Sequence, residues 1–111
     1  MDKHWDLLSL DVLPHHPLIL HSARGQARSV ALHLPAGEQL QDHQVHERAH
    51  LVVVDGEVDV VAGEETVSGG PGLLAVFDPA ERHEVRARSA ARLLLVHAPW
   101  PGDGHPGTRD A

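Results

Sequence analysis

The sequence has no cysteine and no tyrosine, and its large aromatic residues are limited to Trp5, Phe77 and Trp100. The absence of cysteine excludes disulfides, thiolate metal sites and cysteine nucleophiles. Imidazole and carboxylate groups are therefore left as the ligands for any transition metal in this protein.

Positive charge and long apolar runs are also scarce. Nine Lys and Arg residues stand against 16 Asp and Glu residues, which gives a formal net charge of −7. This balance argues against binding to the phosphate backbone of nucleic acids or to anionic membranes. No apolar run approaches the roughly 20 residues that span a bilayer, and residues 1–10 lack the apolar core of a signal peptide. We expect a cytoplasmic protein with no nucleic-acid or membrane partner.

The pattern along the chain is that of short strands. A chain of 111 residues is long enough for one hydrophobic core and too short for two. Residues 5–10 could form a turn or two of helix, which Pro14 and Pro17 would end. From residue 18 onward, short apolar or alternating segments are separated by Gly and Pro turn signals, which predicts an all-β sandwich or barrel. We expect an N-terminal extension over 1–17, a barrel over 18–98 and a tail over 99–111.

Two of the predicted strands are apolar on both faces. Residues 51–54 read LVVV and residues 93–96 read LLLV, so neither face alternates with polar side chains. One face can line the barrel, and the other needs a second sheet or a second subunit to cover it. This pattern favours a homodimer.

Eleven histidines are the outlier of the composition, and three of them lie in the segment DHQVHERAH, residues 42–50. Strand parity places His83 on one face with Val85 and Ala87, which is the inner, apolar face. In a regular strand, His43 and His46 would lie on opposite faces. Both could point inward only if a β-bulge between them changed the parity.

The spacing of two motifs is similar to that of a small single-domain cupin, a family built on a double-stranded β-helix, or jelly-roll, barrel. The first cupin motif is Gly, five residues, His, one, His, three or four, Glu, six, Gly. Gly37, His43 and Gly56 match this spacing, whereas Val45 and Ala49 stand at the second His and the Glu. The resemblance covers residues 18–98.

The second cupin motif is also matched only in part. Gly72 and His83 occupy its Gly and His positions, while Asp78, Ala80 and Ala87 stand where the motif has Pro, Gly and Asn. The resemblance implies a jelly-roll cupin barrel preceded by a short irregular or helical N-terminal segment.

In cupins that bind metal, two His and the Glu of the first motif join the His of the second around one ion. Of these four metal ligands, this sequence has only two at the matching positions, His43 and His83. His46 and His50 each lie one residue after a vacant ligand position. A bulge near Gln44 followed by a compensating deletion before Gly56 would give an all-histidine site of His43, His46, His50 and His83. Such a site suits Zn, Ni, Cu, Fe(II) or Mn. The alternative is that His46 and His50 face solvent and the site is degenerate.

The remaining notable polar and aromatic residues are expected to have structural or surface roles. Glu47 is expected to be a solvated charge and only a reserve metal ligand. Trp100 could cap a barrel mouth or simply pack the C-terminus, and packing is the favoured interpretation. Arg86, Arg88 and Arg92 are expected on the outer face, as a solvated surface or a dimer rim.

Three functions follow from the resemblance and remain open at this point. The first is a non-catalytic module that binds a small molecule inside the barrel. The second is a metal-dependent oxygenase or isomerase acting on a small organic acid or carbonyl compound. The third is a histidine-rich surface that buffers metal. No residue stands out as a general base, and no organic cofactor is expected, so the sequence leaves open whether the protein is an enzyme.

Overall fold

The computed structural model of the chain describes residues 1–43 and 47–100, and at 41–43 the backbone alone. The described residues form strands and turns and no helix, so the all-β prediction is confirmed. The strands are β1 (Leu18–Ser22), β2 (Gln26–Leu34), β3 (Gln39–His43), β4 (Arg48–Asp55), β5 (Val58–Ala62), β6 (Glu65–Gly69), β7 (Leu74–Phe77), β8 (His83–Ala87) and β9 (Ala91–Trp100).

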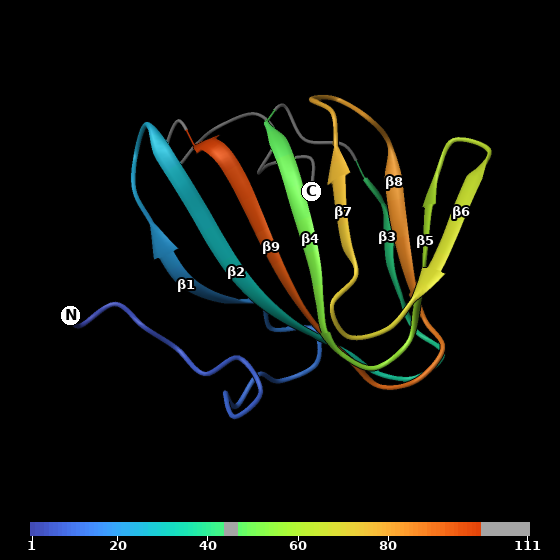
Figure 1. The fold of residues 1–111 in the computed structure, drawn as a ribbon, viewed down its shortest axis with the longest axis horizontal. Helices are drawn as coiled ribbons and strands as arrows, with labels where there is room; N and C mark the ends of the chain where they lie inside the picture. Colours follow the sequence, from blue (N-terminus) through green and yellow to red (C-terminus); the bar gives the residue numbers. More distant parts are fainter. Residues whose placement is uncertain (44–46, 101–111) are drawn as a thin grey trace.

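The strands form two antiparallel sheets, which lie on the left and on the right of Figure 1, and residues of both sheets contribute to one core cluster. One sheet has the order β1-β2-β9-β4-β7 and the other the order β3-β8-β5-β6. Strands from distant parts of the chain are neighbours, because β9 lies between β2 and β4. This two-sheet arrangement is the expected jelly roll. We call the end where β4 and β8 begin and β7 and β9 end the mouth, and the opposite end the base; the mouth is at the top of Figure 1.

The inner rows of the two sheets form the core. Along β8, His83, Val85 and Ala87 are buried while Arg86 is exposed, which confirms the predicted parity of this strand. The core cluster comprises Leu34, Ala49, Leu51, Val53, Val58, Val60, Phe77, Val85, Ala87, Ala91, Leu93 and Leu95. Aliphatic side chains therefore fill the barrel between the mouth and the base, as alternation predicts.

The N-terminal segment is irregular and is tied to the outer face of the five-stranded sheet. A single turn forms where the Leu10 amide donates to the Asp6 carbonyl at 3.2 Å. Arg92 Nη1 donates to the carbonyls of Leu7 (3.2 Å) and Leu10 (2.5 Å). Arg92 lies on the outer face, as expected, but it is not simply a solvated side chain, because its guanidinium satisfies backbone acceptors of this segment. No segment of residues 1–43 and 47–100 forms a helix that could cross a membrane.

A tight turn directs the same segment toward the base of the barrel. The His16 amide donates to the Leu13 carbonyl at 3.2 Å, and Pro14 supplies the fixed φ of the second turn position. His15 follows with a φ of 65°, a left-handed conformation that favours glycine or asparagine. His33 Nδ1 donates to the carbonyl of the buried Val12 at 3.1 Å, which holds the chain just before the turn.

Candidate functional site

His83 is the buried titratable side chain at the mouth of the barrel. It is 2% exposed, and its ring stacks on Phe77 with centroids 3.9 Å apart and an interplanar angle of 5°. Its Nδ1 lies 3.1 Å from the carbonyl oxygen of Glu81. Because a carbonyl only accepts, Nδ1 carries a proton and donates it to Glu81. The backbone thus fixes the orientation of this imidazole.

A layer of inner-row residues crosses the five-stranded sheet beside His83. Cross-strand pairing defines this layer: Arg28 of β2 is paired with His97 of β9, His97 with Ala49 of β4, and Ala49 with Phe77 of β7. Ala49 and Phe77 are buried in the core, so the whole layer belongs to the interior surface. The ring nitrogens of His97 have almost no solvent contact. The mouth is therefore lined by polar side chains above an aliphatic core.

Glu47 is the second buried charged group of this region. It is 5% exposed, so the prediction that it is a solvated charge is wrong. The reason is strand parity: residue 47 leads directly into β4, where Ala49 and Leu51 occupy the inner row. Glu47 continues that inner row by one step toward the mouth. It lies two residues before Ala49, which occupies the Glu position of the cupin motif.

Arg28 brings a positive charge to the same interior layer. Its guanidinium carbon lies 4.7 Å from the centroid of the Trp100 ring, and Trp100 is 2% exposed. This contact places the buried Trp100 ring at the mouth, against the side chain of Arg28. The Nε–H of Arg28 is buried and has no hydrogen-bond acceptor among the residues that the structure describes. A buried guanidinium donor without an acceptor is costly, so this position favours an oxygen acceptor from elsewhere.

The predicted metal ligands do not all come together. His43 ends β3, and its backbone lies opposite His83, but its side chain and the whole of His46 lie outside the described residues. His50 lies on the outer row of β4, where it faces Val76 and Val96. The structure therefore places His50 and His83 on opposite surfaces of the barrel wall.

A register shift lies close to the predicted bulge between His43 and His46, but it is not that bulge and does not test it. The pairing of β3 with β8 shifts register between Leu40 and His43, before His43 rather than near Gln44. Residue 44 itself lies outside the described residues. The predicted four-histidine set stays a prediction.

A metal ion needs three or four well-placed donors. Within residues 1–40 and 47–100, whose side chains the structure describes, no group of three or more His, Asp or Glu side chains is arranged to hold one. His83 and Glu47 are the buried donors at the mouth, and Ala49 removes the carboxylate that the motif would supply. The described donors therefore do not fit a metal site by themselves.

Sequence reasoning missed Arg28 and His97 as residues of the interior. The signal was present, because Arg28 has the same parity as Val30 and Leu32, and His97 the same parity as Leu95. Both residues lie near the strand ends at the mouth, where a long polar side chain can replace the aliphatic residues of the core.

Comparisons with known proteins agree with this geometry. The sequence matches the family model of the Cupin domain over residues 30–97. The chain is similar to the protein TT1209 of Thermus thermophilus, with 26% identity, a TM-score of 0.77, and coverage of 89% of this chain and 99% of that chain.

Two further solved structures share the fold. An RmlC-like cupin of Desulfovibrio desulfuricans has 23% identity, a TM-score of 0.76, and coverage of 89% of this chain and 97% of that chain. The Cnp3 cupin domain of Schizosaccharomyces pombe has 15% identity, a TM-score of 0.76, and coverage of 86% and 68%, respectively. No curated protein matches the sequence significantly.

Proposed function

The chain belongs to the cupin family, and we propose that it is a non-catalytic module that binds a small organic acid or carbonyl compound at the mouth of its barrel. The observation that carries this proposal is the Nε–H of Arg28, which is buried and lacks an acceptor among the described residues. A carboxylate or a carbonyl oxygen of a ligand would satisfy this donor and, for an acid, its charge.

The other residues of the mouth suit such a ligand. The hydrogen bond from Nδ1 to the carbonyl of Glu81 fixes the orientation of the His83 ring at the mouth. Phe77 holds that ring in place by stacking, and the Trp100 ring supports the guanidinium of Arg28. These contacts hold the side chains of the mouth in place before a ligand binds, which favours affinity.

The direct test is a calorimetric titration of the full chain with lactate, pyruvate and malonate. We expect at least one of these acids to bind, and the substitution Arg28→Gln to weaken its binding. Propionamide, which is neutral, serves as the ligand control. Arg86→Gln serves as the protein control, because Arg86 is exposed on the outer row of β8.

A metal-dependent enzyme is the second candidate, and the orientation of His83 favours it. Histidine ligands of metals commonly donate their second ring nitrogen to a backbone carbonyl, as His83 Nδ1 does to Glu81. In this candidate His43 and His83 would be ligands, and the ion would polarise a substrate oxygen. The remaining ligands would have to come from residues whose side chains the structure does not describe.

Elemental analysis of protein purified without a tag separates the two candidates. The binding module predicts a substoichiometric metal content and acid binding that persists after treatment with a chelator. About one Fe, Ni, Mn or Zn ion per chain, lost in His83→Ala, would replace the binding module with the enzyme.

We also propose that the protein is a homodimer joined through the outer face of the five-stranded sheet. On this face, Val52 of β4 is paired with Leu74 of β7 and Leu94 of β9. Two residues along β4, His50 is paired with Val76 and Val96 of the same two strands. Leu74 is 56% exposed and Val76 is 46% exposed. We name the outer apolar patch by its members: Val52, Leu74, Val76, Leu94 and Val96.

A second copy of the chain is the occupant that this patch suits. The patch carries no charged side chain, so two copies with the same net charge of −7 can approach there with little repulsion. An isologous contact would bury the same surface on both subunits.

Substitution of Leu74 by Glu is expected to convert the dimer into a monomer. The new carboxylates would be buried in the interface on both subunits, which weakens association by at least about a hundredfold. Sedimentation velocity at micromolar concentration measures the change. Val67→Glu is the matched control, because Val67 is 44% exposed and lies in β6 of the other sheet. A wild-type protein that sediments as a monomer would contradict the proposal.

A further inference from the structure

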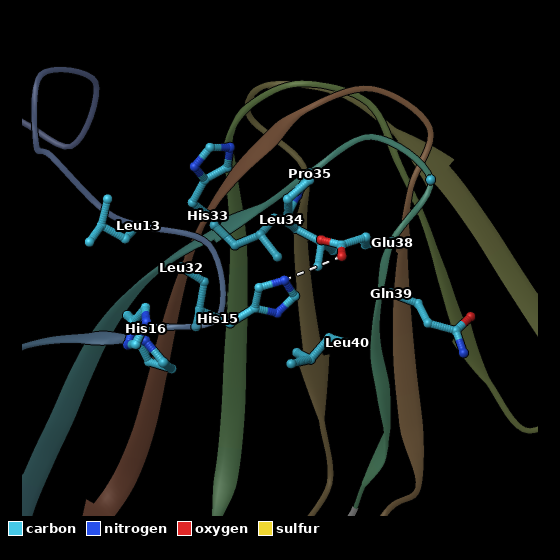
Figure 2. Close-up of a pocket in the computed structure, with 13 residues that line it drawn as sticks. Leu13, His15, His16, Leu32, His33, Leu34, Pro35, Glu38, Gln39 and Leu40 are labelled. Atoms are coloured by element: carbon cyan, nitrogen blue, oxygen red, sulfur yellow. Dashed lines mark ion pairs between the residues drawn. The ribbon is translucent and has the colours of Figure 1, made fainter.

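A cavity lies at the base of the barrel, at the opposite end from Arg28 and His83. It has a volume of about 840 Å³, which is within the range of sites for small organic molecules. It opens between the end of β2, the start of β3 and the N-terminal segment, as Figure 2 shows. Its apolar lining residues are Leu13, Pro17, Leu32, Leu34, Pro35, Leu40 and Leu93.

One carboxylate provides the fixed charge of this cavity. Glu38 lies just before β3, and Figure 2 shows its carboxyl group directed toward His15 and Leu34. Its Oε1 lies 3.3 Å from Nε2 of His15. The Glu38 side chain as a whole is 41% exposed, but its Oε2 is shielded from solvent and has no hydrogen-bond partner among the residues that the structure describes. A carboxylate oxygen in this situation favours a donor, and a cationic donor above all.

The N-terminal segment crosses the cavity as a strap. His33 fixes the strap at Val12, and the turn at Leu13–His16 then places the His15 ring opposite Glu38. The left-handed φ of 65° at His15 is unusual for a residue with a side chain. The ring of His15 itself remains largely exposed, with 72% of its side-chain surface accessible. The strap, residues 11–17, therefore covers one side of the cavity and leaves its interior open.

We propose that this basal cavity binds a small amphipathic amine. The ammonium group would donate to Oε2 of Glu38, and the hydrocarbon part would contact Leu32, Leu40 and Leu93. A primary ammonium carries three donors and no acceptor, which complements a carboxylate that already has His15 on its other oxygen. The site is separate from the mouth, so this inference does not depend on the proposed function.

A cation fits this cavity better than an anion or a metal ion. The histidines that line it are His15, His16 and His33, and the Nδ1 of His33 is already used by Val12. Together with Glu38 these rings do not form a metal site, because no suitable group of three donors exists among the side chains that the structure describes. An anionic ligand would lie beside the carboxylate of Glu38 without a permanent positive charge to hold it.

The test compares three ligands with the same six-carbon chain: n-hexylammonium, 1-hexanol and hexanoate. Calorimetry with the full chain measures affinity, and amide chemical shifts in NMR locate the bound ligand. We expect n-hexylammonium to shift the amides of Leu32, Leu40 and Leu93. We expect hexanol to bind at least about tenfold more weakly, and hexanoate more weakly still, since each lacks the charged hydrogen bond.

A pair of glutamate variants identifies the counter-ion. Glu38→Gln keeps the shape of the side chain and removes its charge, and it should weaken binding of n-hexylammonium about tenfold to a hundredfold. Glu64→Gln, in the exposed β5–β6 turn, should bind like the wild type. Equal affinity of Glu38→Gln and wild type, shifts confined to the mouth, or hexanoate binding as tightly as n-hexylammonium would each overturn the proposal. Should Glu38→Gln fail to fold, the comparison of the three ligands on the wild type decides.

Discussion

Replacement of Gly56 by Ala is expected to lower the free energy of unfolding by about 3 kcal/mol. Gly56 forms the turn between β4 and β5 with a φ of +85°, in the left-handed region. An added Cβ would overlap the carbonyl oxygen of Ala90 and lie 2.6 Å from the Cα of Ala91. Both contacts are with backbone, so no rotation of a side chain can relieve them. A loss of this size is a large part of the stability of a small domain.

Gly63→Ala is the matched control for this prediction. Gly63 also has a positive φ, +62°, but a Cβ there would meet no atom within 4 Å. Only the conformational cost remains, and we expect a loss of about 1 kcal/mol. Urea unfolding of the two variants measures the difference. Equal losses for the two variants would mean that the close approach of Gly56 to the β8–β9 connection is absent.

The fold could be predicted because alternation is a local property. In β8 the order of residues alone assigns His83 and Val85 to the interior and Arg86 to the surface, and the structure has this arrangement. The hairpin at Asp55 and Gly56 was also predictable, since this dipeptide favours the left-handed turn. The resemblance to cupins then supplied the way in which the strands pair.

The candidate site was harder to predict because it depends on residues next to strand ends. Glu47 lies just outside β4, where parity cannot be read unless the first residue of the strand is known. Ligand spacing in the cupin motif suggested a role for His50, but the outer row of β4 carries it. The proposed role of Arg28 in ligand binding depends on the burial of its Nε, and burial of a single atom cannot be predicted from a sequence pattern.

The basal cavity could not be predicted at all from the sequence. It requires the strap at residues 11–17 to pass beside Glu38, and that path is fixed by long-range hydrogen bonds from His33 and Arg92. Neither bond has a counterpart in local periodicity. Residues 1–17 were expected only as an extension.

Substitution of Arg28 by Gln is expected to weaken acid binding at the mouth about tenfold to a hundredfold. Gln keeps a hydrogen-bond donor but loses the positive charge and the stacking of the guanidinium on Trp100. Arg28→Lys keeps the charge without the planar fork, so its affinity should lie between those of Gln and the wild type.

The full-chain titration with lactate, pyruvate and malonate tests the central claim most directly. The account predicts a dissociation constant of about 1 mM or tighter for at least one acid, with weaker binding in Arg28→Gln and unchanged binding in Arg86→Gln. The amide shifts should centre on Arg28, His83 and His97. Absence of binding by all three acids, or equal affinity in Arg28→Gln and the wild type, would contradict it.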